Sequence, residues 1–292
     1  MILQTRLKEK IIKSIFFILA AVSILIILFI FYFLFNEAAP AFNEYGFGIF
    51  SDTWNESQHI YNIGAAIFGT AIVTIGAMCI AIPLGLAGAI FLSELAPYHV
   101  RALLKPVIEL LAGVPSIVYG FLGAVLLVRY LSSTFDMFGY SYLAGSLVLG
   151  IMALPIIISI SDDAMKAVPR SLKEASLAVG ATKWQTIKKV TFPTAISGIS
   201  AGVIMGMGRA VGETMAVSLV VGNLMRIPAP PFNIFSPGAT LTSLIALEMG
   251  EASGMQAYSL FAAGVILFVI VAIMSIISNI LKERIEKKFK GG

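Results

Sequence analysis

The chain has 292 residues, of which 58% are hydrophobic and only 12% are charged. Soluble globular domains carry roughly a quarter charged residues, so this composition excludes an ordinary soluble domain and predicts an integral protein of the lipid bilayer. The formal net charge of +4 does not indicate a nucleic-acid partner, because the basic residues separate by side of the predicted membrane.

Six apolar runs are each long enough to cross a bilayer, which takes about 20 residues. They are continuously apolar rather than alternating, so they predict helices and not barrel strands. The first run is too long for a cleaved signal peptide and predicts a retained helix. In chain order, the predicted spans are residues 15–35, 64–92, 107–128, 137–160, 194–224 and 258–281.

The distribution of lysine and arginine predicts the topology. Of the 20 basic residues, 17 lie at the two ends of the chain and in the loops after the second and fourth spans. The positive-inside rule places these segments in the cytoplasm, so both termini are expected there. The predicted fold is an all-α membrane protein with six transmembrane helices. The expected divisions are a cytoplasmic N-terminus (1–13), one transmembrane domain (14–292, core 62–281), a cytoplasmic loop (162–193) and outer loops (36–62 and 226–256).

The first outer loop carries acidic and aromatic residues but no lysine or arginine between positions 36 and 61. Some of its aromatic side chains are expected in the interfacial belt of the membrane. The loop is therefore a possible docking surface for a partner outside the cell, or simply a membrane-interface segment.

No catalytic or metal-ligating constellation is visible in the sequence. Cys79 is the only cysteine and lies in the second predicted span, where we expect a small buried apolar residue. His59 and His99 are isolated from each other and from any other ligand cluster. Because no nucleophile–base pair is visible either, an enzyme is the least favoured class of function.

The loop at 162–193 is polar and basic, yet it lies between two apolar spans. Residues 161–163 (Ser-Asp-Asp) are expected to cap the helix that enters it. Pro169 suits a first helical position and Gly180 a C-terminal cap. Thr182 and Gln185 predict a capping box for a second short helix.

This loop therefore predicts two short helices with an apolar face that includes Leu172, Ser176 and Val179. Such a face is suited to dock into another protein. The alternative is a solvated basic loop that only obeys the positive-inside rule.

The fifth predicted span contains glycines at 198, 202 and 206, a spacing that allows close helix packing. It also contains Arg209 and Glu213, which would share one face of a continuous helix. Each charge would cost about 2.5–3.5 kcal/mol at the membrane centre, so both must face a partner helix or a wet cavity. They form either a structural pair or a line of charge along a substrate route.

The loop residues Glu174, Ala175, Ser176 and Gly180, followed by residues 190–193, resemble the EAA…G…I-L-P loop of ABC importer permeases. Ser176, Val190 and Phe192 depart from that pattern. Residues 111–120 and 208–217 are similar to the PstC family of phosphate importer permeases. The related PstA family is the closest alternative. The resemblance covers roughly residue 62 to the C-terminus and residues 42–44.

This resemblance implies a type I ABC importer permease fold. Glu174, Ala175, Ser176 and Gly180 would then belong to a cytoplasmic coupling helix that sits in a cleft of the ATPase. Arg209 and Glu213 would line the translocation path for inorganic phosphate. The implied partners are a second, PstA-like permease, a PstB-like ATPase homodimer and an extracytoplasmic PstS-like phosphate-binding protein.

The chain itself is expected to hold no cofactor, because it lacks a G-x-x-x-x-G-K-[ST] phosphate loop. ATP and magnesium would be bound by the partner ATPase. An intramembrane arginine suits an oxyanion, since guanidinium binds phosphate bidentately and keeps its charge when buried. We expect Arg209 to pair with Glu213 at rest and to exchange it for the passing phosphate.

Other classes of function stay open from the residues alone. Arginine is equally compatible with sulfate or molybdate, so a permease for another oxyanion is one alternative. A second is a transporter or channel driven by an ion gradient. A third is a membrane scaffold that recruits a partner without moving any substrate.

Overall fold

The structure, a computed structural model, describes residues 2–135 and 138–290. Six of its helical segments are long and apolar enough to cross a membrane, which confirms the prediction of an all-α fold with six spans. These segments are Lys10–Phe50, Gly64–Leu95, Ser116–Phe135, Tyr142–Lys166, Lys183–Gly212 and Met255–Arg284. Met137, the predicted first residue of the fourth span, lies outside the described residues.

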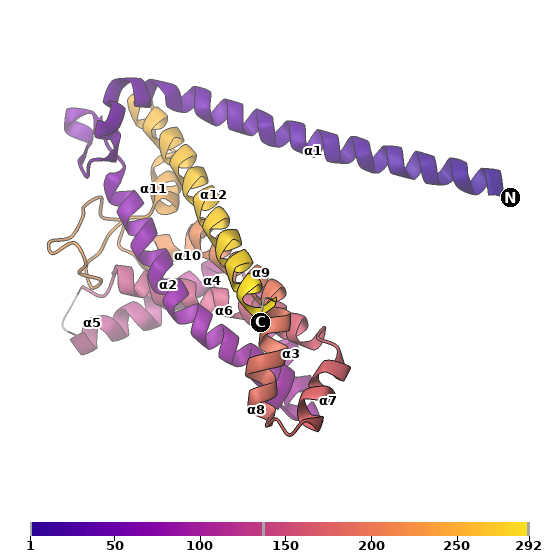
Figure 1. The fold of residues 1–292 in the computed structure, drawn as a ribbon. Helices are drawn as coiled ribbons and strands as arrows, with labels where there is room; N and C mark the ends of the chain where they lie inside the picture. Colours follow the sequence, from indigo (N-terminus) through magenta and orange to yellow (C-terminus); the bar gives the residue numbers. More distant parts are fainter. Residues whose placement is uncertain (1, 136–137, 291–292) are drawn as a thin grey trace.

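The first half of the chain alternates long helices with short surface elements (Figure 1). A two-stranded antiparallel sheet pairs Trp54 with Tyr61 and Asn55 with Ile60. The elements are α1 (Ile2–Tyr45), η1 (Gly46–Phe50), β1 (Trp54–Asn55), η2 (Glu56–Gln58), β2 (Ile60–Tyr61), α2 (Gly64–Ile90), η3 (Phe91–Leu95), α3 (Tyr98–Gly113), α4 (Ser116–Leu122), η4 (Gly123–Val128) and α5 (Arg129–Phe135).

The second half contains two long spans, the polar loop between them, and a final long helix. The end of α12 lies on the same side of the molecule as α3, α7 and α8 (Figure 1). The elements are α6 (Tyr142–Lys166), α7 (Arg170–Ala178), α8 (Lys183–Thr186), η5 (Ile187–Thr191), α9 (Phe192–Gly212), α10 (Met215–Ser218), α11 (Leu241–Glu248) and α12 (Met255–Lys290).

The main core lies where α6 packs between α2 and α9. Ile157 of α6 is fully buried at this junction. A Cβ atom on Gly85 of α2 or on Gly206 of α9 would lie 2.7 Å from the Ile157 side chain. Glycine at these positions therefore allows the helices to approach closely, as expected from the glycine spacing in the fifth span.

Helix α1 packs on α12 only near its C-terminal end, where Phe31 meets Phe268 at 4.2 Å between ring centroids and Phe33 meets Phe261 at 5.8 Å. The rest of α1 extends away from the body of the molecule (Figure 1). Its apolar side chains are exposed there, including Phe17. A helix of this kind needs lipid or another subunit as its surroundings.

The predicted third span, 107–128, is wrong at its start. Helix α3 ends at Gly113, Val114 is extended, and a new helix starts after Pro115. Proline has no backbone N–H and disfavours a helical conformation in the residue before it, so the chain bends here. The Tyr119 hydroxyl donates to the Leu111 carbonyl at 2.9 Å across the bend. The membrane helix therefore begins at Ser116, and α3 is a separate amphipathic helix.

Two further expectations are corrected. The predicted span 194–224 ends early, because α9 stops at Gly212 and Glu213 has an extended backbone. Glycine is a poor helix former, which favours a helix end at Gly212. Because the apolar composition continues past Gly212, composition alone does not reveal the break. Cys79 is exposed on the surface of α2 rather than buried, since it faces away from the α6 interface.

Candidate functional site

We call α7, α8 and the loop between them the coupling segment, after the role that the sequence analysis expects for them. Gly180 in this loop has φ +88°, the left-handed conformation that glycine adopts at little cost. The Thr182 side chain accepts from the Gln185 N–H, and the Gln185 side chain accepts from the Thr182 N–H. These features confirm the predicted glycine cap and capping box. Pro169 precedes α7 as its N-cap and is not its first helical residue.

One side of the coupling segment is anchored to the transmembrane body. The Lys173 ammonium lies 2.5 Å from a Glu94 carboxylate oxygen in η3 and donates to the Met165 carbonyl at 3.3 Å. The hydroxyls of Ser176 and Thr186 are 2.9 Å apart and join α7 to the end of α8. The segment is thereby held against the ends of α2 and α6.

The other side of the coupling segment is exposed and apolar. Val179 is 85% exposed and Trp184 is 59% exposed, with Leu172 and Leu177 also on the surface. Several large apolar side chains exposed on one short segment favour a protein interaction site. Of the predicted coupling residues, Glu174, Ala175 and Gly180 are exposed, while Ser176 is half-buried. The expected apolar face therefore exists, although Ser176 bonds inward.

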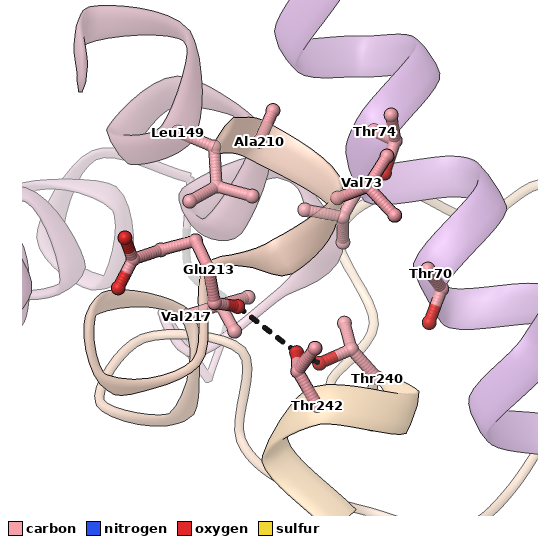
Figure 2. Close-up of a pocket in the computed structure, with 10 residues that line it drawn as sticks. Thr70, Val73, Thr74, Leu149, Ala210, Glu213, Val217, Thr240 and Thr242 are labelled. Atoms are coloured by element: carbon pink, nitrogen blue, oxygen red, sulfur yellow. Dashed lines mark hydrogen bonds between the residues drawn. The ribbon is translucent and has the colours of Figure 1, made fainter. Parts of the chain in front are cut away.

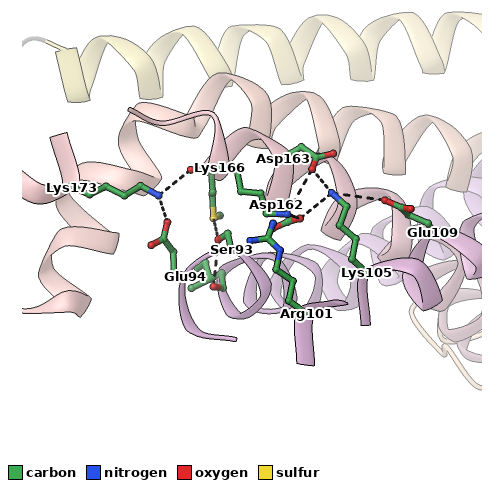
Figure 3. A network of polar contacts seen from close by, with 11 residues as sticks. Ser93, Glu94, Arg101, Lys105, Glu109, Asp162, Asp163, Lys166 and Lys173 are labelled. Carbon is green, nitrogen blue, oxygen red and sulfur yellow. Dashed lines mark hydrogen bonds and ion pairs between the residues drawn. The ribbon is translucent and has the colours of Figure 1, made fainter. Parts of the chain in front are cut away.

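The sequence analysis expected Asp162 and Asp163 to cap a helix, and this expectation is wrong. They lie inside α6, which continues to Lys166. Asp162 is 1% exposed and contacts Lys166 of its own helix, Lys105 of α3 at 3.2 Å and Arg101 of α3 at 3.6 Å (Figure 3). Lys105 also contacts Asp163. We call these five residues the Asp162 cluster.

The electrostatics of the cluster keep its central cation charged. Burial lowers the pKa of Lys105, but the hydrogen bonds and negative charges of Asp163 and Asp162 outweigh burial and raise that pKa above its ordinary value. The Lys105 ammonium that joins α3 to α6 is thus stabilised in its charged form.

The second part of the site is the break between α9 and α10. Arg209 lies in the last turn of α9 and is half-buried. Its Nε is buried and has no hydrogen-bond partner within the described part of the chain. A buried donor without an acceptor costs roughly 1–3 kcal/mol, so this guanidinium is suited to receive an acceptor from a ligand or another subunit.

Glu213 does not pair with Arg209, so the expected resting ion pair is wrong for this conformation. Because the helix ends at Gly212, the two residues do not share one helical face. Among the ion pairs of the described residues, none joins them. The Glu213 carboxylate instead accepts from the Ala216 N–H at 3.3 Å, in the first turn of α10.

Threonine side chains shape the break, and the sequence analysis missed them. The Thr242 hydroxyl donates to the Glu213 carbonyl at 2.9 Å and lies 3.0 Å from the Thr240 hydroxyl (Figure 2). With Thr70 and Thr74 of α2, these residues line a cavity of about 10 Å³, close to the size of one water. Figure 2 shows the Glu213 carboxylate directed away from these hydroxyls. The i, i+4 spacing of Thr70 and Thr74 is the only sequence signal that points to this face.

Comparison with known proteins identifies the family of this chain. Residues 81–290 match the family model described as the binding-protein-dependent transport system inner membrane component. The chain belongs to this family. It is therefore a multi-pass plasma-membrane permease and the transport subunit of an ABC importer.

Curated relatives of this permease cover most of its length. It is 43% identical over 236 residues to the probable ABC transporter permease protein YqgH of Bacillus subtilis, covering 79% of this chain and 75% of that protein. It is 38% identical to the phosphate transport system permease protein PstC of Pasteurella multocida, covering 85% of this chain and 83% of that protein. A probable PstC of Methanocaldococcus jannaschii is 34% identical, covering 89% of both chains.

Solved structures share the fold of this permease at low sequence identity. A bacterial alginate ABC transporter superposes with a TM-score of 0.64 at 18% identity, covering 95% of this chain and 98% of that one. The MetNI methionine ABC transporter superposes with a TM-score of 0.57 at 17% identity, covering 80% and 99%. These likenesses support the ABC importer permease architecture and say nothing of the substrate.

Proposed function

We propose that the chain is the PstC-type permease subunit of an ATP-driven importer of inorganic phosphate, and that it forms half of the translocation path. The observation that carries this proposal is Arg209, a half-buried guanidinium without a hydrogen-bond partner for its Nε among the described residues. It lies at the break of a membrane helix, where bare charge is expensive. A tetrahedral oxyanion offers the acceptors that this group lacks.

The relatives named PstC support phosphate over other oxyanions. We place Arg209 and Glu213 on the translocation path, Arg209 as the cation for the cargo and Glu213 as the residue that shapes the adjoining turn. Glu213 lies between the end of α9 and the start of α10, so its backbone sets how the two elements meet.

We further propose that the coupling segment docks into a separate, homodimeric PstB-like ATPase that binds the ATP and magnesium. The exposed side chains of Leu172, Val179 and Trp184 give this docking an apolar contact area. Glu174, Ala175, Ser176 and Gly180 would belong to the same contact. The concentration of lysine and arginine at this end of the molecule favours a cytoplasmic location for it.

The outer surface of the spans supports a second permease subunit, which we take to be PstA-like. Helix α1 presents apolar side chains to its surroundings along most of its length. An apolar hollow of about 330 Å³ also opens between α4, η4 and α6, lined by residues that include Tyr119, Leu126 and Ile151. An extracytoplasmic PstS-like protein would deliver phosphate at the opposite end, near the loops at 36–62 and 226–256.

The test is anion-stimulated ATP hydrolysis by the assembled complex in proteoliposomes that contain the binding protein. Phosphate should stimulate hydrolysis and drive uptake, whereas sulfate and molybdate at equal concentration should not. Stimulation by one of the other anions would reassign the substrate. Uptake by this chain alone under an ion gradient, without ATP, would contradict the proposed mechanism.

A further inference from the structure

Asp162 stands out among the charged residues that the structure describes, because it is the one that is fully shielded from solvent. Removing a charge from water is costly unless partners compensate for the lost hydration. Three cationic side chains surround it: Lys166 from α6, and Arg101 and Lys105 from α3. The ionic contacts therefore join two helices that are distant in the sequence (Figure 3).

These contacts attach α3 to the end of α6. Helix α3 has no buried residue of its own. Its apolar side chains are at most half-buried, so the ionic contacts add to a partial apolar packing. Lys105, which bonds to both Asp162 and Asp163, fixes the middle of α3 against the last two turns of α6.

The position of α3 in turn determines the position of α4. The two helices meet at the bend at Val114 and Pro115, which the hydrogen bond from Tyr119 to the Leu111 carbonyl closes at 2.9 Å. Helix α4 packs directly on α10, since a Cβ on Gly120 would lie 2.7 Å from the Ala216 Cα. Ala216 is the residue whose N–H donates to the Glu213 carboxylate.

The coupling segment reaches the same end of α6 from the other side. Lys173 of α7 donates to the Met165 carbonyl, three residues beyond Asp162. A displacement of α7 therefore moves the turn of α6 that carries the Asp162 cluster. The cluster gives this displacement an ionic route from α6 to the middle of α3, in addition to the covalent link from η3 through Ala96 and Pro97.

We propose that Asp162 is a positioning residue of the transport cycle. It ties α3 to the end of α6, so that a displacement of the coupling segment reaches α4, α10 and the turn at Glu213. The inference rests on the proposed function, because it assumes that an ATPase moves α7.

One oxygen of the Asp162 carboxylate lacks a hydrogen bond in this cluster. The Asp162 Oδ1 atom is buried and has no hydrogen-bond donor among the described residues, while an Arg101 guanidinium nitrogen is 3.6 Å away. A small shift of α3 would complete this hydrogen bond. The structure shows this contact in its open arrangement, and closing it would supply the second state that coupling between distant sites requires.

The experiment measures phosphate transported per ATP hydrolysed by the complete complex in proteoliposomes. Asp162→Asn removes the central charge, and Lys105→Gln removes the hydrogen bonds that Lys105 of α3 makes to Asp162 and Asp163, while Arg101 and Lys166 remain as cationic neighbours. Each should lower phosphate transported per ATP at least fivefold, with hydrolysis continuing. Lys105→Arg keeps the charge and should stay within twofold of wild type. Lys13→Gln makes the same chemical change on an exposed residue of α1 and serves as the matched control.

Wild-type ratios in both Asp162→Asn and Lys105→Gln would overturn the inference. A second result would also overturn it: these variants assemble poorly, but the complex that does assemble transports the wild-type amount of phosphate per ATP. That result would assign the cluster to folding alone. If the wild-type complex shows no phosphate-dependent hydrolysis, the proposed function fails instead, and the two failures are therefore distinct.

Discussion

The Lys173 ammonium of α7 lies 2.5 Å from the Glu94 carboxylate of η3, and both side chains are mostly shielded from solvent. This ion pair fixes the first coupling helix to the end of α2. Since Lys173 also donates to a carbonyl of α6, one residue connects the coupling segment to two membrane spans.

Replacing Lys173 with methionine should therefore destabilise the permease by about 1–3 kcal/mol, because Glu94 would be left shielded and without its partner. Thermal unfolding in detergent measures this effect as a lower melting temperature. Arg170→Met, on an exposed position of the same helix, is the control and should change stability little. Equal melting temperatures for Lys173→Met and Arg170→Met would show that the pair contributes nothing.

Gly180→Ala should weaken ATPase binding. A Cβ at this position meets no atom within 4 Å, so the substitution causes no clash within the chain. The left-handed backbone, however, costs a non-glycine residue roughly 1–2 kcal/mol, which corresponds to about a tenfold weaker complex if docking requires this turn.

Copurification of the ATPase at graded concentrations measures that change. Gly250→Ala is the matched control, because its added Cβ is also in open space and its φ is not positive. ATPase binding by Gly180→Ala that equals binding by Gly250→Ala would contradict a docking role for the turn.

Arg209→Gln should reduce phosphate uptake at least tenfold while the complex still assembles. The loss follows from removing the cation that would offset the charge of the anion inside the membrane. Arg209→Lys keeps a positive charge but loses the bidentate geometry. Its phosphate uptake should therefore lie between that of wild type and that of Arg209→Gln. Arg129→Gln, an exposed arginine at the end of the third span, should transport normally. Normal ATP-driven flux in Arg209→Gln would leave Arg209 a structural residue at the C-terminal end of α9.

The carboxyl group of Glu248 in α11 makes the stability of the permease depend on pH. Burial is the main cause that raises the pKa of Glu248, the charges of Glu56 and Glu251 raise it further, and the hydrogen bond from Gln256 opposes them. A raised carboxyl pKa in the folded state favours the protonated form. Its stabilising contribution is therefore complete at acidic pH and is lost as the pH rises through the folded pKa.

Glu248→Gln should thus increase the free energy of unfolding at pH 7 by less than about 1 kcal/mol, which is measured as a higher melting temperature. Near pH 4 the substitution should have no effect. Asp52→Asn changes an exposed acid between η1 and β1 and is the control. A Glu248→Gln variant that is less stable than wild type at pH 7 would contradict this assignment.

The sequence predicted the helices and the caps of the coupling segment because those features are local. Apolar length locates a membrane helix, and Gly180, Thr182 and Gln185 act on their immediate neighbours. The breaks at Val114 and Gly212 were missed because apolar composition continues across both of them. The role of Asp162 was also missed, since its partner Lys105 is 57 residues away in the chain.

The resting pair of Arg209 and Glu213 was a consequence of the same error. Four-residue spacing brings two side chains together only while the helix continues, and α9 ends between them. Hydropathy does not show where α9 ends. The Thr242 hydroxyl, which donates to the Glu213 carbonyl from another helix, helps to stabilise the break.

The central claim is that the coupling segment lies in the cytoplasm and contacts the ATPase, and a single thiol at Ala175 tests it most directly. Ala175 is exposed on α7, and replacing the only native cysteine, Cys79, with serine leaves the introduced thiol as the only one. The account predicts that Ala175→Cys resists a membrane-impermeant maleimide in intact cells, reacts after permeabilisation, and cross-links to the ATPase subunit. Labelling from outside intact cells would contradict it.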